Sequence, residues 1–116
     1  ARFEDHHGGQ ARVIVAGDLP RLTDAVVDAL VGAVSEALAN AGKHAEAGLV
    51  TVFAEPGDDG TVFCSVKDDG AGFDPGTPEG VGLSRSIRGR VVEVGGRVEV
   101  DGNPGRGTEV RLWVPS

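Results

Sequence analysis

Cysteine, long apolar runs and basic side chains are all scarce in this 116-residue sequence. A single cysteine, Cys64, excludes an internal disulfide, and its place within an apolar stretch indicates a reduced core thiol and favours a cytoplasmic setting. No apolar run approaches the ~20 residues that cross a bilayer, so we expect no direct membrane contact in this part of the protein.

The shortage of basic residues limits the possible partners. The chain has 18 acidic and 11 basic residues and a net charge of −7. This balance argues against nucleic acid, whose binding depends on cationic contacts to phosphates. The charge is uneven, because residues 1–80 carry 14 acids and 5 bases (−9) and residues 81–116 carry 4 acids and 6 bases (+2). An acidic protein of this kind can still bind a polyphosphate if Mg²⁺ and a few placed cations screen it.

The length fits one domain over residues 1–116, since a chain of this size buries roughly two-thirds of its unfolded surface. The sequence begins with Ala1, and we expect it to be a fragment of a longer protein. Apolar periodicity predicts strands at 12–16, 49–54, 61–68, 98–100 and 110–114, with helices from about 22 to 47 and from about 83 to 94. This order predicts a two-layer α/β sandwich with a mixed, mostly antiparallel sheet and helices on one face.

The first predicted helix carries a polar flank beside its apolar face. Glu36, Asn40 and Lys43 fall together there at helical spacing. A carboxylate, a carboxamide and an ammonium group suit a metal ion and a phosphate chain, because Mg²⁺ favours oxygen ligands. Taken alone, the same flank also fits an ordinary solvated helix surface.

Asp68 ends a predicted strand in which Val62, Cys64 and Val66 share one face. Because side chains alternate along a strand, Asp68 is expected to point to the same inner side and Asp69 to the outside. A carboxylate that points inward is costly unless something donates to it. Asp68 is therefore a candidate ligand-binding residue.

A glycine- and proline-rich stretch follows from residue 69 to residue 82, and we expect a lid at about 73–82. Gly80-Val81-Gly82-Leu83 opens the second helix, where free amides and the helix dipole favour phosphate. The stretch is neither a Walker loop nor a dinucleotide fingerprint, because the lysine and the glycine spacing that define them are missing.

These pieces together resemble the ATP-binding catalytic domain of sensor histidine kinases, in the superfamily shared with gyrase-type and mismatch-repair ATPases. Residues 36–45 (EALANAGKHA) are similar to the N box, residues 68–73 (DDGAGF) to the G1 box and residues 80–83 (GVGL) to the G2 box. Residues 95–100 and 104–110 resemble the closing strand pair. The Glu-x-x-x-Asn and Lys-His version of the N box is similar to that of nitrate-sensor-type kinases.

The resemblance implies a Bergerat-type fold, an enzyme that uses ATP and Mg²⁺, and a role for each matching residue. Asn40 would bind Mg²⁺, and Asp68 would accept from the adenine amine, assisted by Thr108. Glu36 matches the general base of the hydrolysing relatives. The remaining nucleotide contacts would come from Lys43, His44, Gly70, Gly72, Gly80, Val81, Gly82 and Leu83.

The resemblance also implies partners. The γ-phosphoryl group of ATP would pass to a histidine on a separate dimerisation domain and from there to a response regulator, in the cytoplasm or in the cytoplasmic part of a membrane-bound sensor. His6 and His7 lack the helical setting of such a phosphoacceptor, so this chain alone is not expected to phosphorylate itself. Two alternatives remain open: a serine kinase of the anti-sigma-factor type and a nucleotide-sensing module without catalysis. His44 could equally be a packed core histidine.

Overall fold

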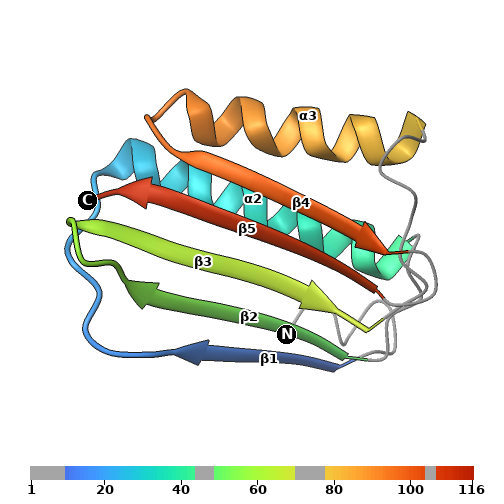
Figure 1. Ribbon diagram of the computed structural model, residues 1–116, viewed down its shortest axis with the longest axis horizontal. Coiled ribbons are helices and arrows are strands. Elements are labelled where there is room, and N and C mark those ends of the chain that lie inside the picture. The colour runs from blue at the N-terminus through green and yellow to red at the C-terminus, as the bar shows by residue number, and fades with distance from the viewer. Residues whose placement is uncertain (1–9, 44–48, 70–77, 104–106) are drawn as a thin grey trace.

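The computed structural model describes residues 10–43, 49–69, 78–103 and 107–116, with the backbone alone described at 10, 40–43, 78–81, 83 and 103. These residues form five strands and two helices in the order β-α-β-β-α-β-β (Figure 1). The elements are β1 (Gln10–Val15), α2 (Asp24–Lys43), β2 (Leu49–Pro56), β3 (Thr61–Asp68), α3 (Pro78–Val92), β4 (Arg97–Asn103) and β5 (Gly107–Pro115).

The five strands form one sheet in the order β1-β2-β3-β5-β4. β1 runs parallel to β2, and the three other neighbouring pairs are antiparallel. The sheet is thus mixed and mostly antiparallel, as predicted. Its register places Asp68 between Val50 of β2 and Thr108 of β5.

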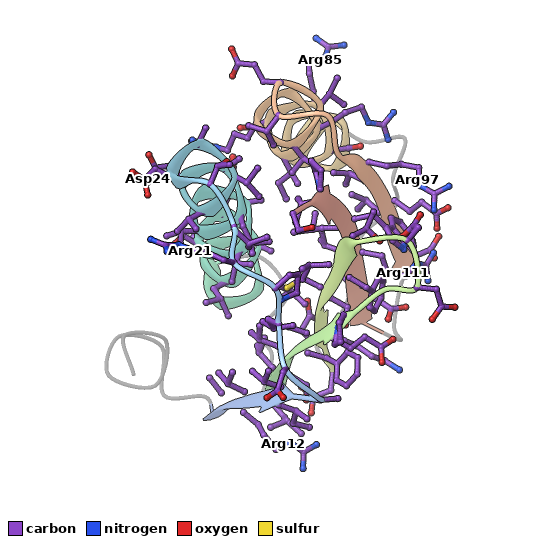
Figure 2. All side chains as sticks on the ribbon, turned by 90° about the vertical axis from the view of Figure 1, so that its left-hand side faces the viewer. Arg12, Arg21, Asp24, Arg85, Arg97 and Arg111 are labelled. Carbon is purple, nitrogen blue, oxygen red and sulfur yellow. The ribbon has the colours of Figure 1, made fainter. Side chains whose placement is uncertain are left out.

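Both helices pack on the same face of the sheet (Figure 2), which confirms the two-layer sandwich. α2 contributes small buried residues, Ala29, Ala33 and Ala37, which let it lie close to the strands. The face of α3 that meets them carries Ile87 and Val91, both fully buried. The sheet supplies inward valines and leucine at alternating positions, namely Val50, Val62, Val66, Val98, Val110, Leu112 and Val114. Within the described ranges, no helix combines the length and the apolar character that crossing a membrane requires.

The helix starts differ slightly from the sequence-based expectation. α2 begins at Asp24, and the Thr23 hydroxyl accepts a hydrogen bond from the Val26 amide at 3.3 Å, which caps the first turn. α3 begins at Pro78, so the predicted helix start at about 83 was too late, and the helix overlaps the second half of the stretch expected to be a lid. Proline suits the first helical position because its missing N–H is not needed there.

Gly95 and Gly96 end α3 as the sequence predicted. Gly95 has a φ of +84°, and its amide donates to the Val92 carbonyl at 2.9 Å. The Gly96 amide donates to the Val91 carbonyl at 2.9 Å, and an added Cβ at Gly96 would lie 2.6 Å from the Trp113 carbonyl. The turn therefore brings β4 back tightly against β5.

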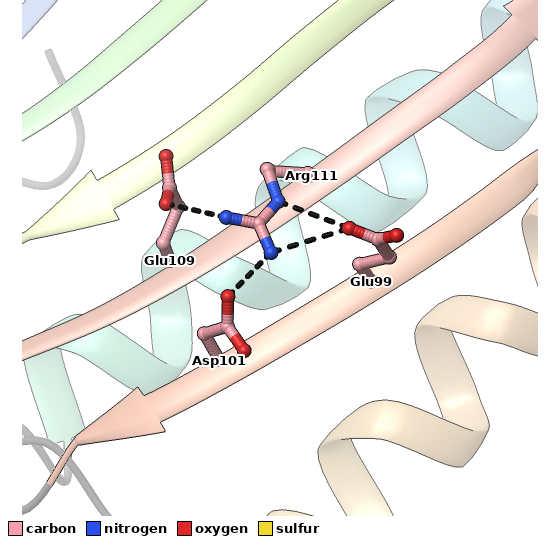
Figure 3. Close-up of polar contacts among 4 residues, drawn as sticks. All are labelled: Glu99, Asp101, Glu109 and Arg111. Carbon is pink, nitrogen blue, oxygen red and sulfur yellow. Dashed lines mark hydrogen bonds and ion pairs between the residues drawn. The ribbon is translucent and has the colours of Figure 1, made fainter.

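The face of the sheet opposite the helices carries aromatic and charged side chains. Trp113 lies there, because it alternates along β5 with the buried Leu112 and Val114, and its ring is 5.3 Å from the Phe63 ring, with the Arg97 guanidinium 4.1 Å from it. Arg111 contacts three carboxylates (Figure 3): Glu109 at 2.9 Å, Glu99 at 3.2 Å, and Asp101. The hydrogen bond that Arg111 donates to the Asp101 carboxylate is the main reason that the pKa of Arg111 is raised.

Replacing Arg111 by methionine should lower the free energy of unfolding by about 1–2 kcal/mol, because three carboxylates would then repel one another. Urea denaturation at low and high salt measures this effect, which should shrink as salt screens the repulsion. Adding Glu99→Gln to Arg111→Met should recover part of the loss. A loss that is independent of salt and is not recovered by Glu99→Gln would contradict the electrostatic explanation.

Cys64 should make folding stability fall at alkaline pH. Burial raises the pKa of its thiol to about 11, whereas an unfolded thiol titrates near pH ~8.5. Between these values the unfolded chain loses a proton that the folded chain keeps, so stability is full below the lower value and declines as pH rises. Urea unfolding at several alkaline pH values should show this decline in the wild type and a smaller one in Cys64→Ala; equal declines would contradict it.

Candidate functional site

The segments predicted to bind ligand end at one side of the molecule. The C-terminal end of α2, the start of α3, the C-terminal end of β3 and the start of β5 all lie at the right-hand end of Figure 1. The sheet therefore brings Asp68 and Thr108 to the same end at which the helices bring residues 40–43 and 78–83.

Asp68 points toward the helices and is 6% exposed, which confirms the predicted orientation. Its register partner Thr108 is 4% exposed, and the Thr108 amide donates to Asp68 Oδ1 at 3.3 Å. This bond fixes one carboxylate oxygen against the start of β5. A buried carboxylate held in this way is oriented to accept from a ligand.

Thr108 adds a second polar group beside Asp68. Its Oγ1 is buried and has no hydrogen-bond partner among the described residues. Leaving a hydroxyl buried without a partner costs about 1–3 kcal/mol, so such groups generally mark a place where a water or a ligand completes the bonding. Thr108 therefore has the position and the chemistry for the role beside Asp68 that the resemblance implies.

Gly107 sets the distance between the two strands at this point. Its φ is +93°, and an added Cβ would lie 2.1 Å from the Asp68 carbonyl oxygen. A glycine is required here both by the backbone conformation and by the close approach. The side chains of Asp68 and Thr108 meet because β5 can begin directly against the end of β3.

Asp69 has a structural role that its sequence position did not reveal. It is exposed, as predicted, and its Oδ1 accepts from the Leu49 amide at 2.8 Å, while its own amide donates to the Leu49 carbonyl at 3.2 Å. This pair of bonds ties the start of β2 to the end of β3, next to Asp68.

Glu36 lies on the flank of α2 that faces α3. Its Oε2 accepts from the Ser86 hydroxyl at 2.8 Å and lies 3.6 Å from Arg90 Nε. An added Cβ at Gly32, one turn earlier in α2, would lie 3.0 Å from Arg90 Nη1. The helices therefore run antiparallel, with residue 32 beside residue 90 and residue 36 beside residue 86.

This antiparallel register has a consequence for the rest of the predicted N box. Positions 40 and 43 follow Glu36 at four- and seven-residue spacing, on the same flank of α2. They continue toward the N-terminal turns of α3, where residues 80–83 lie. The N-box and G2-box segments therefore lie at the same end of the molecule as Asp68 (Figure 1).

The glycines of the G2 segment are helical. Gly80, Val81, Gly82 and Leu83 occupy the first two turns of α3, where unpaired amides and the helix dipole favour an anion. Gly82 is exposed, and no described heavy atom lies within 4 Å of an added Cβ. Packing against the described residues thus does not explain a glycine at this position.

Some predicted site residues lie outside what the structure describes. His44, Gly70 and Gly72 fall in undescribed segments, and the side chains of Asn40, Lys43, Val81 and Leu83 are likewise not described. Their predicted contacts stay predictions. Among the described residues, no cluster of three or more His, Cys, Asp or Glu side chains could hold a metal ion.

An open depression lies along α3 and the residue that follows it. Its described lining consists of Arg85, Ser86, Arg88, Gly89, Arg90, Val92 and Glu93. Neither Asp68 nor Thr108 is among these residues, so the depression does not include the Asp68–Thr108 pair.

The chain belongs to the family of histidine kinase-, DNA gyrase B- and HSP90-like ATPases, whose description matches residues 25–116. It is 34% identical over 92% of its length to an uncharacterised sensor-like histidine kinase of Chloroflexus aurantiacus. It is 31% identical over 98% of its length to the oxygen sensor histidine kinase NreB of Staphylococcus carnosus. The chain spans only 19% and 33% of these two relatives, respectively.

Solved structures give the same result for the fold. The histidine kinase domain of the Erythrobacter litoralis EL346 blue-light activated kinase matches 98% of this chain and 56% of that one, with a TM-score of 0.75 at 25% identity. Full-length ShkA in complex with AMPPNP matches 98% of this chain and 27% of that one, with a TM-score of 0.73 at 29% identity. The fold is that of histidine kinase ATPase domains, as the sequence predicted.

Replacing Gly107 by alanine should destabilise the protein by at least about 2 kcal/mol, because the new Cβ meets the Asp68 carbonyl and the backbone φ is strained. Urea unfolding measures the loss. Gly60→Ala is the matched control: Gly60 also has positive φ (+80°), but its added Cβ would be 3.6 Å from the nearest atom, the Ser116 hydroxyl oxygen. Equal losses in the two variants would show that the close approach to Asp68 contributes nothing.

Proposed function

We propose that this chain is a single histidine-kinase-like catalytic domain that binds Mg²⁺·ATP at the end where β3, β5, α2 and α3 converge. The observation that carries the proposal is the buried Asp68 carboxylate beside the unpartnered Thr108 hydroxyl. A carboxylate accepts from the exocyclic amine of adenine, and the threonine hydroxyl bonds the same base directly or through a water. Guanine presents a carbonyl at that position, so the site should prefer ATP to GTP.

The polyphosphate extends from this base site toward the helices. Lys43, His44 and the residues 80–83 contact the phosphates, and Gly70 and Gly72 line the base. Mg²⁺ is bound in enzymes mainly by substrate phosphates with one or two protein oxygens, so the Asn40 carboxamide oxygen suffices as a protein ligand. The helix N-terminus at α3 adds a favourable field for the phosphate charge.

The bound ATP supplies its γ-phosphoryl group to a histidine on a separate dimerisation domain, which then serves a response regulator. The bond between the γ-phosphorus and the bridging oxygen breaks, a phosphorus–nitrogen bond forms, and ADP leaves with the electron pair. The imidazole proton passes to a base or to water, and Glu36 orients either the histidine or a water on the metal.

The kinase relatives and the lone reduced cysteine support this role and a cytoplasmic location. Assignment to the nitrate-sensor-like subclass is part of the proposal.

Replacing Asp68 by asparagine should weaken ATP binding at least about 30-fold, because the asparagine oxygen would accept from the Thr108 amide and the side-chain NH2, a donor, would then face the adenine amine. Calorimetric titration with ATP and Mg²⁺ tests this, with GTP as the control nucleotide. Circular dichroism must show the variant folded.

Asp69→Asn is the matched control, because it keeps the oxygen that accepts from the Leu49 amide. It should bind ATP as the wild type does. Unchanged ATP affinity in Asp68→Asn, or wild-type affinity for GTP equal to that for ATP, would contradict the base-recognition role of Asp68.

A further inference from the structure

The Glu36 carboxylate contacts two residues of α3, Ser86 and Arg90, to which the proposed function assigns no role. The Ser86 hydroxyl donates to Oε2 at 2.8 Å, and Arg90 Nε lies 3.6 Å from the same oxygen. Both contacts therefore act on one carboxylate oxygen. This restrains the rotation of the carboxylate and leaves its other oxygen, Oε1, outside both contacts.

The sequence of α2 makes room for this contact. Gly32 is a helix-interior glycine, which is unfavourable for helix stability. The Arg90 side chain lies directly over it, with Nη1, Cδ and Cζ at 3.0, 3.2 and 3.4 Å from an added Cβ. The absence of a side chain at Gly32 thus leaves the space in which the Arg90 side chain lies as it extends to Glu36.

Stability alone gives little reason for this arrangement. The side chains of Arg90 and Glu36 are 52% and 31% exposed, and ion pairs at such positions contribute little to folding free energy. What the contacts do provide is a fixed geometry. Glu36 lies one turn before Asn40, and the two contacts hold that flank of α2 against the helix that carries Gly80 and Gly82.

We propose that Ser86 and Arg90 are positioning residues that orient the Glu36 carboxylate for phosphoryl transfer and set α2 against α3. This inference rests on the proposed function and deepens it, because it assigns a task to α3 beyond phosphate binding. Ser86 and Arg90 do not contact the nucleotide, so their removal should slow the transfer step and leave nucleotide affinity almost unchanged.

The test uses the full-length kinase that contains this chain. Phosphorylation of its histidine is measured as kcat and KM for ATP in Ser86→Ala and Arg90→Met. We expect kcat to fall about tenfold, as for misplacement of a reacting group, with KM within about twofold of the wild-type value. Ser86→Thr, which keeps the hydroxyl, should restore kcat. Arg85→Met is the matched control, because Arg85 extends away from α2 and the sheet (Figure 2) and should leave both constants unchanged.

Exchanging the two charges distinguishes orientation of the Glu36 carboxylate from an ion pair that only holds the two helices together. Glu36→Arg combined with Arg90→Glu should keep an ion pair between the helices and recover the Tm lost in the single variants. The carboxylate then lies on α3, so kcat should stay low. Recovery of kcat in the exchanged protein would overturn the proposal, as would unchanged kcat in both Ser86→Ala and Arg90→Met, or a rise in KM alone. Failure of the wild-type protein to bind Mg²⁺·ATP would instead overturn the proposed function, and this inference with it.

Discussion

The close approach of β5 to the end of β3 is the constraint on which the candidate site depends. Gly107 allows this approach, because a Cβ atom at position 107 would lie only 2.1 Å from the Asp68 carbonyl oxygen. The approach pairs Asp68 with Thr108 and buries both among apolar strand residues. Asp69 secures the same end from the other side through its two bonds to Leu49. A polar pair is thus built at the edge of an apolar core.

The two layers of the sandwich make different contributions to this site. The sheet fixes Asp68 and Thr108 by backbone register, which varies little because a shift of one residue would turn every inward valine outward. At the helix level, Glu36 of α2 contacts Ser86 and Arg90 of α3 through side chains. In the proposed site, the part assigned to the base is therefore set by backbone register, and the part assigned to the phosphates depends on the relative position of the helices.

Strand parity and helical spacing were enough to predict much of this arrangement. The inward orientation of Asp68 and the outward orientation of Asp69 follow from a two-residue period, and the structure confirms both. The start of α3 was missed because Pro78 and Gly80 look like loop residues, although proline is favourable in a first helical turn. The contacts of Glu36 with Ser86 and Arg90 were not predictable, because the register between two helices is a tertiary property that neither sequence period contains.

The distribution of stability explains why such a site can be altered separately from the fold. The fully buried side chains, such as Ile87, Val91 and Leu112, lie between the helices and the middle of the sheet, where burial contributes most to folding. The polar contacts of the site are few, and several are partly exposed, so each contributes little to folding free energy. Their value lies in geometry, because a reacting group displaced by about 1 Å can cost a hundredfold in rate without a measurable change in the core. Substitutions of these residues should therefore be judged by rate and affinity before melting temperature.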